Sequence, residues 1–197
     1  MEKTKTKTNV ALEVTVCAMF TAITAVLSQI AIPIGPVPIS CSLIAVYLSG
    51  LLLSPKLAVI SQLVYLLLGA VGVPVFANFG AGIAKLAGPT GGYLAVYPVL
   101  ALILSLFMLV YDKRVKQEKT WIRVAFLASI LVLSLAVCYL TGTLWFCLYS
   151  GSTVAKALSL TVIPFIAGDI VKIVLCIILT LSLRPLFLKT LQKHGMQ

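Results

Sequence analysis

The acidic residue with the most unusual setting in this sequence is Asp169, which stands in a long apolar segment three residues before Lys172. A spacing of i, i+3 places both side chains on one face of a helix. A charge near the bilayer centre costs roughly 2.5–3.5 kcal/mol on insertion scales, whereas such a pair returns only about 0.2–0.5 kcal/mol. The pair therefore needs water, other polar groups or a ligand. The alternative interpretation is structural: Asp169 caps a helix start and Lys172 extends outward to water.

A second candidate region lies between Gly72 and Gly92, where six glycines and two prolines interrupt an otherwise apolar sequence. Asn78 offers an amide between the aromatic side chains of Phe76 and Phe79, and Lys85 follows seven residues later. Non-helical backbone is tolerated at membrane depth only where it packs against protein or lines a cavity. We therefore predict that this stretch is a gate over a binding pocket.

The sequence Gly-Pro-Thr-Gly-Gly-Tyr occupies residues 88–93, at the end of this stretch and at the start of a long apolar segment. Glycines at a helix start allow a ligand to approach free N–H groups closely. The same residues are also compatible with a turn whose glycines only pack two helices together. The spacing is not that of a phosphate-binding loop. Tyr93, and Trp145 further along the chain, are candidate walls of the pocket.

Side chains suited to catalysis or metal binding are scarce. The five cysteines form no CxxC pair, and the single histidine, His194, stands near the C-terminus. The five acidic residues include no pair at catalytic spacing. We therefore predict no catalytic residues, no metal ligands and no cofactor. A pocket for a small molecule requires much less, namely apolar walls with a few polar groups.

The amino-acid composition indicates whether the protein that positions these residues folds in water or in a lipid bilayer. The 197 residues are 61% hydrophobic and 10% charged, whereas soluble domains average roughly 45–50% apolar and about 25% charged. This excludes a cytosolic enzyme, a fused ATPase domain and a nucleic-acid-binding protein. The net charge of +10 instead indicates orientation in a membrane and contact with anionic lipid headgroups.

The apolar segments predict an all-α integral membrane protein with six transmembrane helices in a single domain, residues 1–197. The predicted spans are Val14–Ile32, Ile39–Leu53, Leu57–Val71, Tyr93–Tyr111, Val124–Leu148 and a last span from about Gly168 to Arg184–Pro185.

The positions of the basic residues predict the orientation of these spans. With both termini inside, 12 of the 15 basic residues lie on the inner side, and Lys85, Lys156 and Lys172 lie in the outer half. Residues 1–10 and 112–123 are then cytoplasmic basic segments, and the 72–92 gating stretch lies outside. The localisation predicted is multi-pass in the plasma membrane of a bacterium or archaeon.

Small residues form a stripe on the first span, with Ala18 and Ala22 one helical turn apart. Such faces allow another helix to approach closely. The stripe either packs inside this chain or offers a docking surface to a partner.

Four segments together resemble the BioY family, the biotin-specific S components of energy-coupling-factor (ECF) transporters, over about residues 11–188. They are Ile32–Pro38, Val64–Phe76, Gly88–Tyr93 and Ile163–Lys172, which ends in Gly168-Asp169-x-x-Lys172. Gly88–Tyr93 and the late Gly-Asp-x-x-Lys motif are specific in combination. Lys85 departs from the family pattern, because that position is usually apolar or small.

The resemblance implies a six-helix membrane subunit that captures biotin for ATP-driven uptake. Its partners would be biotin, a transmembrane coupling protein, two ATPase subunits and the lipid bilayer, with ATP bound only by the partners. The family's polar biotin contacts would fall on Asn78, Asp169 and Lys172, with Tyr93 nearby, and Ala18 and Ala22 would dock on the coupling protein. An S component for another vitamin and a small membrane-embedded enzyme remain as alternatives.

Overall fold

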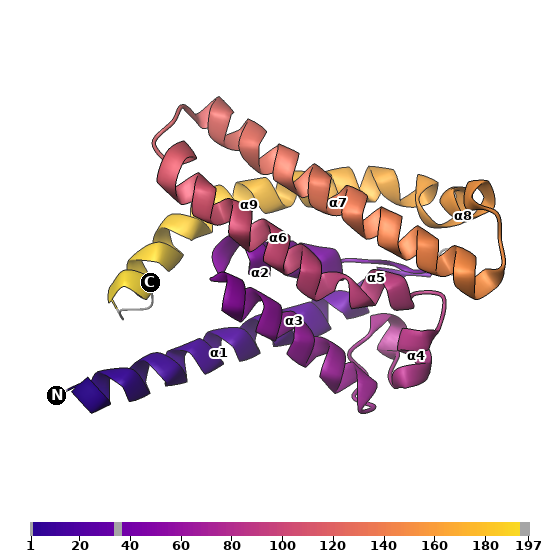
Figure 1. Cartoon of the computed structure of the whole chain (residues 1–197), viewed down its shortest axis with the longest axis horizontal. Coiled ribbons are helices and arrows are strands. Elements are labelled where there is room, and N and C mark those ends of the chain that lie inside the picture. The colour runs from indigo at the N-terminus through magenta and orange to yellow at the C-terminus, as the bar shows by residue number, and fades with distance from the viewer. Residues whose placement is uncertain (1, 34–36, 194–197) are drawn as a thin grey trace.

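The computed structural model describes the backbone of residues 2–33 and 37–193, and the side chains of residues 10–33 and 37–188. This part of the chain is helical apart from one short hairpin (Figure 1). Its elements are α1 (Glu2–Gln29), β1 (Ala31–Ile32), β2 (Ile39–Ser40), α2 (Ser42–Leu52), α3 (Pro55–Ala70), η1 (Ala77–Phe79), α4 (Ile83–Ala87), α5 (Gly91–Ala95), α6 (Tyr97–Val110), η2 (Tyr111–Val115), α7 (Thr120–Ser150), α8 (Val154–Thr161), η3 (Ile163–Phe165) and α9 (Ile166–Lys193).

Four segments of the described chain are long and apolar enough to cross a membrane: Val10–Gln29, Gly91–Val115, Thr120–Ser150 and Val154–Leu188. Two further apolar helices, α2 and α3, are shorter, with 11 and 16 residues. The prediction of an all-α membrane protein is therefore confirmed. Two of the six predicted spans correspond to the shorter helices.

The second predicted span begins later than expected, at Ser42. The residues before it, Ile39–Ser40, pair as an antiparallel strand with Ala31–Ile32. Their backbone hydrogen bonds are satisfied across the hairpin, so these two residues are not helical. Residues 34–36, between the two strands, lie outside the described residues.

Helix α2 is the centre of the bundle and packs against α1, α3, α6 and α9. Its side chains at Ala45, Val46, Tyr47 and Leu51 have no exposed surface. At Gly50 the backbones of α2 and α6 approach so closely that a Cβ atom would lie 2.7 Å from the Cβ of Leu104. Because neighbouring helices surround it, α2 presents little surface to lipid and does not need the length of an isolated span.

The fifth predicted span is confirmed as α7, and it ends at the predicted break. Gly151 adopts a left-handed conformation with φ +64°, and its N–H donates to the Cys147 carbonyl at 2.9 Å. Glycine tolerates this conformation without strain, which is why it commonly ends helices. The next apolar stretch forms α8 and the 3-10 turn η3, which contains Pro164. Helix α9 then starts at Ile166, so that Asp169 falls in its first turn.

The predicted end of the last span at Arg184–Pro185 is not the end of its helix, because α9 continues through Pro185 to Lys193. Proline lacks the N–H that the helix needs and disturbs the preceding turn, and α9 changes direction near its yellow end in Figure 1. Arg184 is anchored here. Its Nε and Nη2 donate to the two carboxylate oxygens of Asp112 at 3.0 and 2.6 Å, and its Nη1 donates to the Leu51 carbonyl.

The predicted basic loop 112–123 is largely helical. The fourth span continues as the π-helical turn η2 to Val115, and α7 starts at Thr120. Figure 1 places this connection at the same end of the bundle as the N-terminal end of α1 and the C-terminal end of α9. Helices α4 and α8 lie at the opposite end.

Candidate functional site

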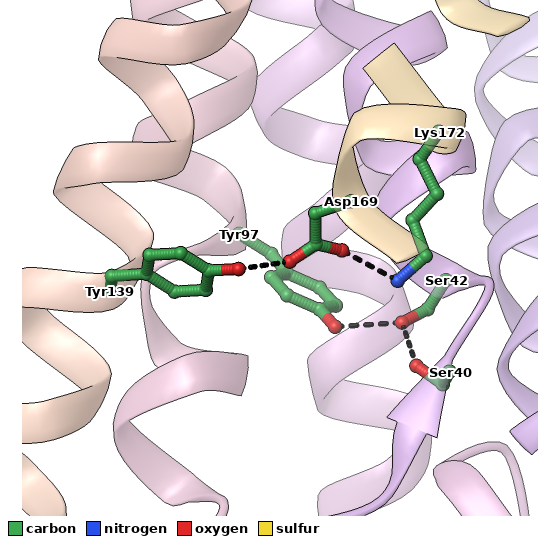
Figure 2. A network of polar contacts seen from close by, with 6 residues as sticks. All are labelled: Ser40, Ser42, Tyr97, Tyr139, Asp169 and Lys172. Carbon is green, nitrogen blue, oxygen red and sulfur yellow. Dashed lines mark hydrogen bonds and ion pairs between the residues drawn. The ribbon is translucent and has the colours of Figure 1, made fainter. Parts of the chain in front are cut away.

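Asp169 and Lys172 form a buried ion pair in the first turns of α9. The Lys172 ammonium lies 2.8 Å from Oδ1 of Asp169, and the two residues are 8% and 3% exposed. The hydroxyl of Tyr139, from α7, donates to Oδ2 of the same carboxylate at 2.5 Å. Figure 2 shows Tyr139 and Lys172 on either side of the Asp169 carboxylate. Lys172 is therefore paired inside the protein and does not extend to water.

A second polar chain lies beside this cluster. The hydroxyl of Ser42, at the start of α2, is 2.7 Å from that of Tyr97 on α6 and 2.6 Å from that of Ser40 in β2. These hydroxyls can each donate or accept. Figure 2 shows the chain next to the Asp169–Lys172 pair. The hairpin thus brings Ser40 to the site, although it is distant in sequence from α9.

Both polar groups border a small cavity of about 60 Å³, which we call the Asp169 cavity. Small-molecule sites typically have volumes of roughly 300–1,000 Å³, so the walls of this cavity must move apart to admit a ligand. Apolar and aromatic side chains make up most of its walls. The lining residues are Val37, Pro38, Ser40, Leu43, Tyr93, Tyr97, Cys138, Tyr139, Phe165, Asp169 and Lys172.

A second small cavity of about 50 Å³, the Lys85 cavity, adjoins the first. The two share the lining residues Val37, Pro38, Ser40, Tyr93 and Tyr97. The Lys85 cavity is further lined by Phe76, Ala77, Lys85, Thr90 and Leu94. The Asp169–Lys172 pair lines one of these adjoining cavities, and a second lysine, Lys85, lines the other.

The structure brings most of the predicted site residues together, but not all of them. Asp169, Lys172 and Tyr93 line the Asp169 cavity, and Phe76, Lys85 and Tyr93 line the Lys85 cavity. Asn78 and Phe79 do not line either cavity. Both are exposed, Phe79 by 73%, and both have positive φ values, 58° and 55°.

The glycines of residues 88–93 pack against α7. A Cβ atom at Gly92 would lie 2.3 Å from the Cβ of Trp145, and the Trp145 indole N–H donates to the Gly88 carbonyl at 2.9 Å. Trp145 therefore anchors this turn and does not line either cavity. On α7, a Cβ atom at Gly142 would lie 2.1 Å from the ring of Tyr93. The interpretation as a packed turn is thus correct for the glycines, and their packing positions Tyr93.

Sequence reasoning missed the hydroxyl groups of this site, Ser40, Ser42, Tyr97 and Tyr139. Serines and tyrosines inside apolar helices follow no spacing that marks them as ligands. The one signal was the position of Ser40 two residues after Pro38, the last of three closely spaced prolines. Among the described residues no group of three His, Cys, Asp or Glu side chains could hold a metal. The site can therefore bind through hydrogen bonds, charge and apolar contact.

Ala18 and Ala22 lie on the outer surface of α1 and are exposed. Ala18 borders an apolar groove between α1 and α3, whose lining residues are Glu13, Val14, Cys17, Ala18, Thr21, Lys56, Leu57, Ile60 and Val64. The two alanines are thus accessible to a partner helix and are not buried inside this chain.

Known proteins share both the sequence and the fold. The family model described as the BioY family matches residues 1–189. A Pyrococcus horikoshii protein described as a probable biotin transporter BioY is 42% identical over 167 residues, which cover 85% of this chain and 93% of that protein. The Thermotoga maritima biotin transporter BioY is 36% identical over 168 residues, with coverage of 85% and 93%.

A solved structure agrees with these relatives. It is described as the S-component for biotin from an ECF-type ABC transporter, and it superposes with a TM-score of 0.79 at 27% identity. The match covers 89% of this chain and 92% of that one. The chain described here therefore belongs to the BioY family.

Proposed function

We propose that this chain is the substrate-binding membrane subunit that captures biotin for an ATP-driven ECF transporter. The observation that carries the proposal is the buried Asp169–Lys172 pair on the wall of an internal cavity. An ion pair inside an apolar protein is costly unless it has further partners. The described relatives are biotin transporters and biotin S components, and the BioY family is one of transporter subunits and not of enzymes.

The chemistry of biotin suits the two ends of the site. Its cyclic urea carries two N–H donors and one carbonyl acceptor, next to an apolar sulfur-containing ring. The Asp169 carboxylate has lone pairs left for the urea N–H groups, because each oxygen accepts more than one hydrogen bond. Lys172 and the Tyr97–Ser42–Ser40 chain supply donors for the urea carbonyl. The aliphatic tail then extends past Tyr93 toward the Lys85 cavity.

Asn78 joins this site if the 72–92 gating stretch rearranges when biotin enters. The Asn78 amide would then donate a hydrogen bond to the urea or accept one from it. Its positive φ value is uncommon for a non-glycine residue, so a change toward a commoner conformation would relieve strain at this position.

We further propose that the partners are a transmembrane coupling protein and two ATPase subunits. The small, exposed stripe at Ala18 and Ala22 supports docking of a partner helix, because helices in lipid associate through close van der Waals contact. The chain itself carries no phosphate-binding loop, so that ATP would be bound by the ATPases alone. Nucleic acid is not a partner in this proposal.

The orientation we propose has six crossings, by α1, α2, α3, α6, α7 and α9, with both termini in the cytoplasm of a bacterial or archaeal cell. Two observations support it. The basic segments gather at one end of the bundle (Figure 1). The short helix α2 is surrounded by protein, where a span need not match the lipid thickness.

The decisive experiment is to purify the protein and identify the small molecules that purify with it by mass spectrometry. Biotin in stoichiometric amount, and saturable binding of added biotin by calorimetry, are the expected results. Another bound vitamin would assign a different S-component specificity. A chemically altered product of an added compound would indicate a membrane-embedded enzyme and refute the proposal.

A further inference from the structure

Gln29, the last residue of α1, is hydrogen-bonded to the gating stretch with both ends of its amide. Its Nε2 lies within hydrogen-bond distance of the carbonyls of Pro74 and Phe76, at 3.3 and 3.2 Å, and of two acceptors in α1, the Ala25 carbonyl and Ser28 Oγ, at 3.3 and 3.1 Å. Its Oε1 accepts the backbone N–H of Phe79 at 2.9 Å. Since a carbonyl can only accept and an N–H can only donate, these partners fix the orientation of the amide. The neighbouring Ser28 donates to the Val75 carbonyl.

The segment bonded to Gln29 includes two residues whose backbone conformation is unfavourable without stabilising contacts. Asn78 and Phe79 are consecutive non-glycine residues with φ values of 58° and 55°. This left-handed region is unfavourable for L-residues, and for a bulky residue it is rare. The Phe79 side chain is 73% exposed and packs too little to compensate. Two backbone hydrogen bonds of 3.0 Å between Phe76 and Gly80 close the turn, and the hydrogen bond from the Phe79 N–H to Gln29 ties it to α1.

The same segment forms a wall of the ligand site. Phe76 and Ala77 line the Lys85 cavity. The Phe76 ring is fully buried, with its centroid 5.5 Å from that of Tyr65 in an edge-to-face arrangement. It lies directly over Gly69, where a Cβ atom would approach the ring to 2.0 Å. Movement of residues 74–79 would therefore open the wall of this cavity.

We propose that Gln29 is a positioning residue that keeps residues 74–79 closed over the cavity and thereby sets the rate at which the bound ligand leaves. Gln29 borders neither cavity and acts on the ligand only through the loop. The identity of the ligand as biotin rests on the function proposed above, whereas the restraint on the loop does not.

The test compares Gln29→Leu, which removes all three contacts, with Gln29→Glu, which keeps an acceptor for the Phe79 N–H and loses the donors to the two carbonyls. Val26→Ala is the matched control, because Val26 lies one turn earlier on α1 and is 65% exposed. Hydrogen exchange of the Phe79 amide is measured in the ligand-free protein. Association and dissociation rates of biotin are measured on the same preparations.

In Gln29→Leu we expect faster exchange at Phe79 and biotin dissociation that is roughly tenfold faster, with a smaller change in the association rate. In Gln29→Glu we expect slow exchange at Phe79 but fast dissociation of biotin. Val26→Ala should match the parent in every measurement.

Parental exchange at Phe79 and parental dissociation in Gln29→Leu would overturn the proposal. An equal increase of Phe79 exchange and biotin dissociation in Val26→Ala would also overturn it, because the effect would then come from a general loosening of α1. If Gln29→Leu does not fold, Gln29→Asn replaces it, since its shorter amide cannot reach all three partners. If the parent protein does not bind biotin, the proposed function fails, and the exchange of the Phe79 amide still decides whether Gln29 restrains the loop.

Discussion

The Asp169–Lys172 pair supports a prediction that separates its structural role from its role in binding. Both side chains are less than a tenth exposed, and their charged atoms are 2.8 Å apart. Asp169→Asn removes the counter-charge of the Lys172 ammonium, and Lys172→Met removes the counter-charge of the Asp169 carboxylate. Breaking a buried pair by removing one partner costs about 3–5 kcal/mol. For a chain of this length that corresponds to a fall in melting temperature of about 6–20 °C.

The double variant Asp169→Asn/Lys172→Met has neither charge to bury. Replacing a whole buried pair by neutral groups is often neutral or stabilising. We therefore expect the double variant to be at least as stable as either single variant. Its affinity for biotin should nevertheless stay low, because the charged acceptor for the urea N–H groups is gone. Such a hydrogen bond to a charged group is worth about 1.5–3 kcal/mol, or roughly 10–150-fold in Kd.

The assay measures the thermal unfolding of the four proteins in one detergent or nanodisc and their Kd for biotin by calorimetry. A control variant, Leu148→Ala, changes a side chain of α7 that is 84% exposed, and should behave as the parent. Two results would refute the reasoning. One is parental stability and parental affinity in either single variant. The other is a double variant that is destabilised by the sum of the two single losses.

Three further predictions concern the partner surface, the second lysine and the gate. Ala18→Trp should leave biotin binding near the parental value but abolish ATP-driven uptake by the full complex; equal loss of both, or normal uptake, would contradict docking at this surface. Lys85→Met should weaken the binding of biotin about tenfold or more but leave that of biotinamide, which lacks the carboxylate, unchanged; equal losses for both ligands would rule out a carboxylate contact. Hydrogen exchange over residues 72–92 should slow markedly when biotin is saturating, and equal exchange would reject the gate.

The sequence was most informative about features that depend directly on composition and periodicity, namely the surrounding solvent and the helical fold. A chain that is 61% hydrophobic and 10% charged must satisfy its backbone in lipid, and its continuous apolar segments of about 20 residues do so as helices. The pairing of Asp169 with Lys172 was also predictable, since their spacing is set by the helix itself. Both residues, with Tyr93, line the Asp169 cavity.

The partners of these residues were decided by tertiary structure. Tyr139 reaches Asp169 from another helix, and Ser40 reaches the site because a hairpin replaces the start of a predicted span. Contacts between distant segments depend on how the helices pack, and no local pattern of residue types records that packing. The same holds for Gln29, whose role becomes visible only when residues 74–79 lie against the end of α1. The sequence by itself determined the solvent, most of the helices and the Asp169–Lys172 pair, because these depend on neighbours along the chain. The cavity, its hydroxyl groups and the restraint on its wall depend on neighbours in space.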